Sequence, residues 1–356
     1  MLSVQTFADI PAEIKRRIEG GERVLLVLLD AFGLEFLERH RDHPLVQRLS
    51  VQPLRAQFPS TTTVHVTTMA FGLPVQEHGL YEWHVLEPAL DTMICPLRFA
   101  LAASEMTDEL VGRLDPLELV PGETVYERLA VGSLVAQPGV IAGSAFTRLA
   151  TRGAEVVGVE SLGAGVRAGL DALRGGFGYA NVYWDAVDGV GHRFGPSSPE
   201  FAARSRAVLD ELWAELRAVR DVTVLLTADH GQIDVDPSRV DYVDDLWPEL
   251  TELLTQPQPA GSSRDMFLHV GAEHVDHVIA ELAVRLEGRA SVRRAESVFA
   301  SIGPRLQARL GDVLVLPAPG HQVWLRSAAA NETWFRGHHG GLEEVETSTY
   351  LAELSV

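Results

Sequence analysis

The sequence predicts an α/β fold in which a mainly parallel central sheet is flanked by helices. Short, continuous apolar runs occur at 24–29, 180–184 and 222–226, and such runs are typical of strands that are buried on both faces. Helix-like stretches such as 199–219 flank them. This alternation indicates a sheet whose two faces are covered by helices.

The N-terminal segment, residues 1–21, has the pattern of an amphipathic helix with mixed charge. It lacks the uninterrupted apolar core of a secretory signal. No other segment approaches the roughly 18 to 20 apolar residues of a membrane span. We therefore expect a cytoplasmic protein that does not associate with membranes.

The stretch FPSTTTVHVTTMAFGLPVQEHG, residues 58–79, contains three consecutive threonines. Threonine is β-branched and common in strands, so one interpretation is the edge of a half-buried strand. Pro59 and Ser60 before the run, and Gly72 and Pro74 after it, instead favour a turn that leads into a short helix. A hydroxyl at the start of such a helix lies where anions bind.

The pattern changes after His230. Two segments look helical and two look like strands, namely 240–254 and 275–286, and 266–270 and 313–316. We interpret residues 240–316 as an inserted α+β cap subdomain. Residues 1–239 and 317–356 then form the core.

Composition limits the function. The 356 residues are 46% hydrophobic, which is enough for a sizeable core, and carry a formal charge of −19. General nucleic-acid binding depends on clustered Lys and Arg, so we expect no stable nucleic-acid complex and a small-molecule partner instead. The single cysteine, Cys95, excludes an internal disulfide framework and a cysteine-rich zinc module.

Acids follow the predicted strands. Asp30 ends the first run, Asp188 follows the second, and the pair Asp229–His230 follows the third. Because binding crevices of parallel sheets lie at the carboxyl ends of strands, these residues are the first candidates for a site. The stretch DGVGHRFGP also places His192 four residues after Asp188, where the glycines allow a tight loop in which both side chains face one ion.

Each of these motifs has a simpler explanation when it is taken alone. An Asp and a His at this spacing are usually a solvated surface pair, Asp229–His230 fits a turn that caps a helix, and GHHGG fits a flexible turn. Together they supply acid and imidazole ligands without a thiolate. This donor set suits zinc or manganese, and six ligands divide into two sites of three, as in two-metal phosphoryl transfer.

The ordered set Asp30, FPSTT, HG, DGVGHRFGP, ADHG and GHHGG spans residues 30–341. It resembles the alkaline phosphatase superfamily, and most closely its nucleotide pyrophosphatase/phosphodiesterase branch. The resemblance implies a core of that fold, two divalent metal ions, zinc or alternatively manganese, and a threonine nucleophile. It also implies hydrolysis of phosphodiester or pyrophosphate bonds of small substrates such as nucleotides through a phospho-threonine intermediate.

Matching the family motifs assigns the nucleophile to Thr62, the fifth residue of FPSTT. One metal site then consists of Asp188, His192 and His339, and the other of Asp30, Asp229 and His230 with Thr62 as an exchangeable ligand. The nearest competitors for these roles are His338, Asp185, His65 and His78.

The sequence departs from the family pattern after the HG motif. Where the branch commonly has an asparagine that holds a phosphate oxygen, this chain has Trp83. Trp83 and Tyr81 are candidates for substrate binding by stacking, although large aromatic residues more often pack in a core. The alternative functions are a phosphomonoesterase of the same superfamily, for which Arg55, Arg98, Arg193 or Arg336 is a candidate extra cation, and a metal-binding protein without catalysis.

Overall fold

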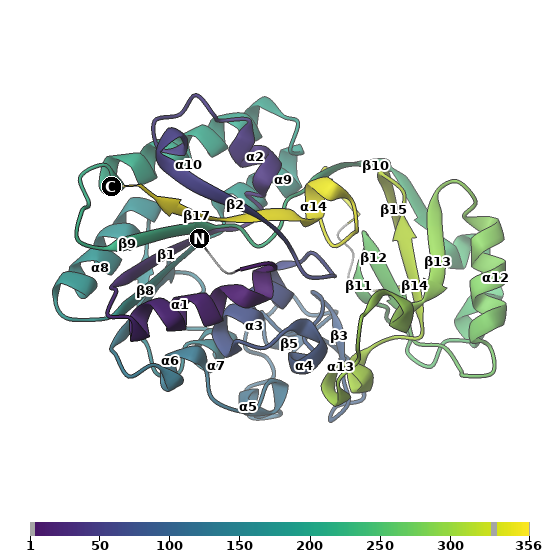
Figure 1. The fold of residues 1–356 in the computed structure, drawn as a ribbon. Coiled ribbons are helices and arrows are strands. Elements are labelled where there is room, and N and C mark those ends of the chain that lie inside the picture. The colour runs from purple at the N-terminus through teal and green to yellow at the C-terminus, as the bar shows by residue number, and fades with distance from the viewer. Residues whose placement is uncertain (1–3, 329–332, 356) are drawn as a thin grey trace.

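The computed structural model describes residues 4–328 and 333–355, and it confirms the predicted α/β architecture (Figure 1). A seven-stranded sheet lies at its centre. Across the sheet the strands follow the order β2 (Leu49–Arg55), β17 (Ser348–Leu354), β9 (Thr223–Thr227), β1 (Val24–Leu29), β8 (Tyr179–Trp184), β6 (Ser133–Pro138) and β7 (Glu155–Val159).

The middle of this sheet is parallel. β1 pairs in parallel with β8 on one side and β9 on the other, with Val24 opposite both Tyr179 and Thr223. All six residues of β1 are buried, as expected of an apolar run in a strand covered on both faces. Only the edge formed by β17 and β2 is antiparallel among the pairings of this sheet in the described residues.

Helices cover both faces of the sheet (Figure 1). One face carries α8 (Leu162–Arg174), α9 (Ala186–Phe194) and α10 (Pro199–Leu216), and the other carries α1 (Ile10–Glu19), α3 (Thr62–Phe71), α6 (Val125–Arg128) and α7 (Ala145–Ala150). α1 is the predicted N-terminal helix, of whose segment residues 1–3 lie outside the described part. No helix of the described residues is long and apolar enough to cross a membrane.

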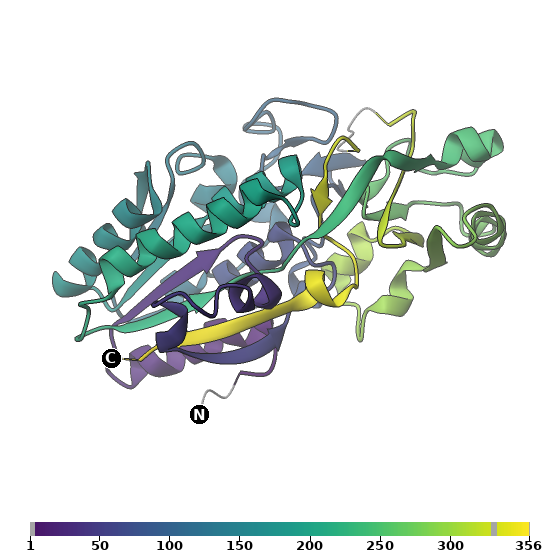
Figure 2. The ribbon, with the colours of Figure 1, turned by 90° about the horizontal axis from the view of Figure 1, so that it is seen from above.

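A smaller lobe lies beside the main sheet (Figure 2). It contains a four-stranded antiparallel sheet of β11 (Ala260–Ser262), β12 (Asp265–Leu268), β14 (Val313–Pro317) and β13 (Ala290–Arg294), with α12 (Val275–Arg285) packed on it. Leu268, Val278, Leu282 and Val315 belong to a hydrophobic core of its own. The boundaries of the cap at 240 and 316 remain a prediction.

Two further small sheets and several short elements connect these parts. β15 (Gly320–Trp324), β10 (Ile233–Tyr242) and β16 (Gly337–His338) form one sheet, and β3 (Val85–Glu87), β4 (Thr92–Cys95) and β5 (Ala100–Leu101) form the other. The remaining helices are α2 (Leu34–Glu38), α4 (Val75–His78), α5 (Pro116–Leu119), α11 (Val243–Leu246), α13 (Pro304–Arg309) and α14 (Glu344–Thr347), with 3₁₀ turns η1 (Phe7–Asp9), η2 (Val46–Arg48), η3 (Pro248–Glu252) and η4 (Ala295–Val298).

The prediction of a helix over 240–254 is wrong. The first residues of that segment end β10 and pair with β15, with Val240 opposite Gln322. The rest forms the short helix α11 and the 3₁₀ turn η3, separated at Trp247. Pro248 explains the interruption, because proline has no N–H to continue an α-helix.

Candidate active site

The three central strands deliver the predicted acids to one edge of the sheet. Asp30 follows β1, and Asp188 lies in α9 directly after β8. Asp229 and His230 follow β9. Because these strands are parallel neighbours, their carboxyl ends lie together, as the sequence analysis expected.

Asp188 and His192 lie on a helix and not on the predicted glycine loop. They are four residues apart in α9, which places both on the same helical face, and His192 Nε2 lies 3.2 Å from Asp188 Oδ1. Gly191 serves close packing here, since a Cβ at this position would come within 1.7 Å of Gln232 Oε1. Gln232 Nε2 donates to Asp188 Oδ1 at 2.5 Å and holds that carboxylate in place.

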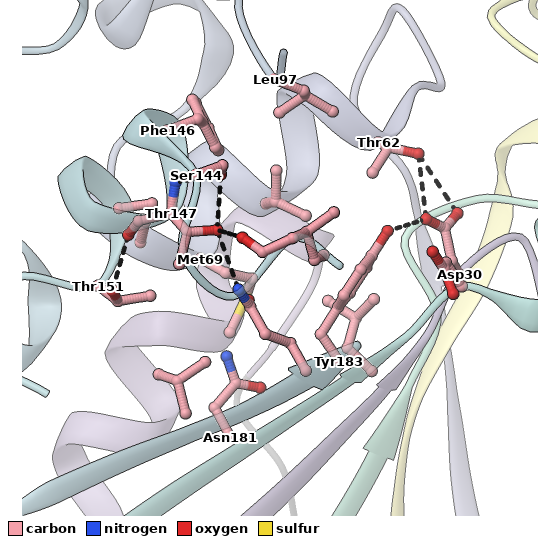
Figure 3. Close-up of a pocket in the computed structure, with 18 of the residues that line it drawn as sticks. Asp30, Thr62, Met69, Leu97, Ser144, Phe146, Thr147, Thr151, Asn181 and Tyr183 are labelled. Carbon is pink, nitrogen blue, oxygen red and sulfur yellow. Dashed lines mark hydrogen bonds between the residues drawn. The ribbon is translucent and has the colours of Figure 1, made fainter. Parts of the chain in front are cut away.

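The three threonines belong to a helix start. Thr61 has an extended backbone before the first turn of α3, and the helix begins at Thr62 and ends at Phe71, where it is capped by Gly72, whose φ of +63° suits glycine. Thr62 Oγ1 lies 3.3 Å from each carboxylate oxygen of Asp30 and 3.2 Å from His230 Nε2. Figure 3 shows this hydroxyl facing the Asp30 carboxylate.

Asp30, Asp229 and His230 form the first cluster, in which one potential ligand atom from each lies within 4.8 Å of the others. Asp229 Oδ1 accepts hydrogen bonds from the N–H groups of Ala31 and His230, whereas Asp229 Oδ2 is buried without a hydrogen-bond partner. His230 Nδ1 donates to the carbonyl of Gly231, which leaves a lone pair on Nε2. Asp229 Oδ2 therefore has no hydrogen-bond partner, and His230 Nε2, which faces the Thr62 hydroxyl, has a lone pair that a metal ion could use.

The second cluster adjoins the first and contains Asp188, His192 and His339. His192 Nδ1 donates to the carbonyl of Gly337 and His339 Nδ1 donates to that of Ser60. Both Nε2 atoms then carry lone pairs, and His339 Nε2 lies 3.7 Å from Asp188 Oδ1. Backbone carbonyls that fix the tautomer in this way are typical of histidine metal ligands.

The electrostatics of the clusters favour bound cations. Burial, together with the nearby Asp229 and Asp188, raises the pKa of Asp30, and burial raises the pKa of Asp229 to about 7. Burial also raises the pKa of Asp188, but His192 and His339 outweigh it and bring it to about 2. Three carboxylates buried this closely repel one another, and the donor set of oxygens and imidazoles is of the kind that binds divalent metal ions.

His338 is closer to the second cluster than the sequence ranking suggested. One nitrogen each of His192, His338 and His339 lie within 4.8 Å of one another. His338 Nε2 is buried without a hydrogen-bond partner. Its Nδ1 lies 2.9 Å from both the main-chain N and O of His339, so either tautomer finds a partner. His338 thus joins the candidate ligands. The sequence shows two adjacent histidines in one motif, but it does not show which of the two faces the metal site.

The other competitors lie elsewhere. His65 bonds the carbonyl of Thr61 and His78 bonds Thr68, so both histidines support α3 from within the core. Asp185 lines the pocket beside Thr62 without belonging to either cluster.

Sequence reasoning missed Tyr183. It lies in β8 and its hydroxyl donates to Asp30 Oδ2 (Figure 3), so it helps to orient that carboxylate. No motif marks it, because a tyrosine within an apolar strand run is usually a core residue.

The two aromatic residues proposed to bind substrate differ in place. Trp83 lines the pocket that also contains Thr62 and Asp30. Tyr81 is not among the residues that line this pocket, because its side chain is fully buried, packs edge-on against Phe267 and donates to the carbonyl of Arg309. Tyr81 is a core residue.

Comparisons with known proteins show which sequences and folds this chain is similar to. The sequence model of the family described as type I phosphodiesterase / nucleotide pyrophosphatase matches residues 150–342. A curated relative, ectonucleotide pyrophosphatase/phosphodiesterase family member 3 from rat, is 23% identical over 280 residues. The match covers 74% of this chain but only 31% of the rat protein, so this chain spans about a third of that relative's length.

Solved structures share the fold. Mouse ectonucleotide pyrophosphatase / phosphodiesterase 5 has a TM-score of 0.65 at 16% identity, covering 93% of this chain and 88% of the mouse chain. Phosphonoacetate hydrolase from Sinorhizobium meliloti 1021, in complex with phosphonoformate, has a TM-score of 0.67 at 17% identity, with coverages of 94% and 91%. An inactive threonine-to-alanine variant of the mouse protein, in complex with AMP, has a TM-score of 0.64 at 16% identity, with coverages of 93% and 87%.

Proposed function

Because the chain belongs to the type I phosphodiesterase / nucleotide pyrophosphatase family, within the alkaline phosphatase superfamily, we propose that it hydrolyses phosphodiester or pyrophosphate bonds with Thr62 as the nucleophile. One observation carries this proposal. The Thr62 hydroxyl lies at the N-terminus of α3, within 3.3 Å of Asp30 and 3.2 Å of His230, two members of the first ligand cluster. The mouse variant in which a threonine is replaced by alanine is described as inactive, which supports giving a threonine this role.

Each of the two clusters would bind one divalent metal ion. Asp30, Asp229 and His230, with Thr62, would hold one divalent ion. Asp188, His192 and His339 would hold the other, with His338 as a further candidate. Bound divalent ions supply positive charge that acidifies the attacking hydroxyl and stabilises the negative charge that develops on phosphate oxygens. Zinc is the ion we propose, with manganese as the alternative.

Thr62 performs the bond-making step. Its hydroxyl points toward the Asp30 carboxylate, so the oxygen lone pairs are available to attack phosphorus while the hydroxyl proton is lost to water. The bond from phosphorus to the leaving group breaks at the same time, and the leaving alcohol, or the leaving phosphate of a pyrophosphate, takes up a proton from water. The product is a phospho-threonine ester at Thr62. Attack by water on this ester releases phosphate or a phosphate monoester and restores the hydroxyl. Each attack inverts phosphorus, so the complete reaction proceeds with net retention.

The start of α3 also provides donors for the phosphate. The first backbone N–H groups of an α-helix have no partner within the helix, and the helix dipole favours an anion beside them. The family pattern has an asparagine where this chain has Trp83, and Trp83 contributes an apolar ring to the same pocket instead of a hydrogen-bond donor for the phosphate. The N–H groups at the start of α3 would take over the role of that asparagine.

The experiment that tests this function measures kcat/KM for bis(4-nitrophenyl) phosphate and for 4-nitrophenyl phosphate after chelation and reconstitution with zinc or manganese. We expect metal-dependent hydrolysis that favours the diester. Thr62→Ala should lower kcat by roughly 10³-fold or more. Thr67→Ala is the matched control, because Thr67 is a buried threonine of the same helix whose hydroxyl bonds only the carbonyl of Thr63. Equal activity of Thr62→Ala and the parent protein would refute the nucleophile, and absence of turnover in the metal-loaded protein would favour the non-catalytic alternative.

A phosphomonoesterase or phosphonate hydrolase is the second candidate function, and Arg98 is the observation that favours it. Of the four arginines considered from the sequence, Arg98 alone lines the pocket with Thr62 and Asp30. It can contact the additional negative charge of a monoester or of a carboxylated phosphonate. If this candidate is correct, 4-nitrophenyl phosphate is the better substrate and Arg98→Ala selectively reduces its hydrolysis relative to that of the diester.

A further inference from the structure

A pocket of about 310 Å³ extends from Thr62 into the main lobe (Figure 3). It lies between two helices and the sheet. Val66 and Met69 line it from α3, and Phe146 and Ala150 line it from α7. This size is at the lower end of the range of small-molecule sites, so the pocket can enclose one substituent of a phosphate ester.

The labelled residues of the pocket divide into a side with the Asp30 carboxylate, near Thr62, and an uncharged side. Figure 3 shows Asp30 and Thr62 on one side and Ser144, Thr147 and Thr151 on the other. The charged lining residues are Asp30, Asp185, Asp188 and Arg98. Asp30 and Asp188 are candidate metal ligands. The labelled residues on the far side carry no charge.

The hydroxyl groups on the far side bond within the protein. Thr147 Oγ1 donates to the carbonyl of Ile141 at 2.8 Å and receives hydrogen bonds from Ser144 and Gln137. Thr151 Oγ1 donates to the carbonyl of Thr147 at 2.7 Å. A ligand thus finds few free donors here and meets mainly methyl groups and aromatic rings.

Asn181 is the exception on this neutral surface. It lies in β8, opposite Leu26 in β1 and Val135 in β6, and is only 7% exposed. Its Nδ2 donates to the hydroxyl of Tyr126 at 3.0 Å, while its Oδ1 is buried without a hydrogen-bond partner. Figure 3 shows the amide directed into the pocket. A buried carbonyl oxygen without a hydrogen-bond partner destabilises the fold, so the Asn181 Oδ1 atom in a central strand points to a ligand.

We propose that this pocket binds a neutral, mainly apolar substituent of the phosphate substrate, and that Asn181 selects a substituent with a hydrogen-bonding group at its far end. The inference rests on the proposed function, because the phosphate must be held beside Thr62 for its substituent to enter the pocket. It specifies the substrate class: a phosphate ester of an uncharged alcohol less polar than a nucleoside.

Direct binding measurements test the proposal without turnover. Titration calorimetry on the zinc-loaded protein compares methyl-, propyl-, 2-phenylethyl- and 2-(3-hydroxyphenyl)ethylphosphonic acid, which share one phosphorus group, with thymidine 5′-monophosphate. Burial of each methylene tightens binding about fourfold, so propylphosphonate should bind about 15-fold more tightly than methylphosphonate. The hydroxyl should add about fivefold over the phenylethyl compound.

The outcomes separate the two proposals. If methylphosphonate binds as tightly as the larger compounds, or thymidine monophosphate binds more tightly than all of them, the pocket assignment is wrong while the metal site stands. If none of the compounds and no inorganic phosphate binds, the proposed function is wrong and this inference falls with it.

Substitution of Asn181 tests its selective role. Asn181→Leu should reduce the preference for the hydroxyphenyl over the phenyl compound from about fivefold to none. Asn181→Ala repeats the comparison if the leucine variant does not fold. Ser133→Ala is the matched control, because Ser133 in β6 is also buried with an unpartnered hydroxyl but does not line the pocket, and it should keep the parent preference. An unchanged preference in both Asn181 variants would refute the assignment.

Discussion

Arg264 and Glu346 join the smaller lobe to the loop that carries His339, and breaking this pair should destabilise the protein strongly. Arg264 lies between β11 and β12, and Glu346 lies in α14. Their side chains are 2% and 0% exposed. Arg264 donates to both carboxylate oxygens, at 3.1 and 2.8 Å, and Glu346 also accepts the N–H of Gly341 at 3.0 Å.

The expected magnitude follows from what remains after substitution. Arg264→Met removes the only guanidinium in this bidentate contact and leaves a buried carboxylate with backbone N–H donors alone. Loss of one partner of a buried pair costs about 3 to 5 kcal/mol of unfolding free energy. Adding Glu346→Gln removes the unpaired charge, so the double variant should be more stable than Arg264→Met alone.

The assay is urea unfolding of the parent protein, both single variants and the double variant, analysed as a double-mutant cycle. We predict a coupling free energy of at least about 2 kcal/mol between Arg264 and Glu346. We also predict weaker zinc binding by Arg264→Met, because Gly341 lies two residues after His339. A loss below about 1 kcal/mol in Arg264→Met would refute this account of the pair.

Three further predictions concern electrostatics, packing and metal. The Arg16 and Arg17 guanidinium groups lower the pKa of buried Glu13 to about 2, so Glu13→Gln should lower the free energy of unfolding by about 2 kcal/mol at pH 7. In urea titrations this difference in unfolding free energy should persist above about pH 4.5 and vanish as the pH falls toward 2. A difference that grows in acid would contradict this prediction. Gly191→Ala should displace Gln232 and weaken zinc binding about 10- to 100-fold by calorimetry, whereas Gly189→Ala, with nothing within 4 Å of its added Cβ, should bind zinc as the parent does. Chelation should lower the melting temperature, because zinc at 100 times its Kd stabilises the folded state by about 2.7 kcal/mol, and an unchanged melting temperature would argue against structural metal binding.

The sequence predicted the centre of the fold better than its periphery. The run at 24–29 forms β1 with the predicted bounds, because six consecutive Val and Leu residues suit a strand buried on both faces. The segment 240–254 was predicted as a helix and instead begins in a strand, because its pairing with β15 involves residues about eighty positions away. Such long-range contacts leave no local pattern.

In the candidate site, too, the sequence predicted local relations better than contacts between distant elements. Spacing within a motif predicted that Asp188 and His192 act together, but not that a helix brings them together. Partners from distant elements, such as Tyr183 on Asp30, left no signal in the sequence. The orientation of Tyr81 into the core also depends on Phe267 from the smaller lobe, which a reading along the chain does not place beside it.

The stereochemical course at phosphorus tests the central claim most directly. A chiral phosphorothioate diester is hydrolysed in ¹⁸O-labelled water by the zinc-loaded protein, and the configuration of the product is determined. If Thr62 is the nucleophile, two successive inversions occur and the product retains its configuration. Net inversion would mean that water attacks phosphorus directly, and it would contradict the phospho-threonine mechanism.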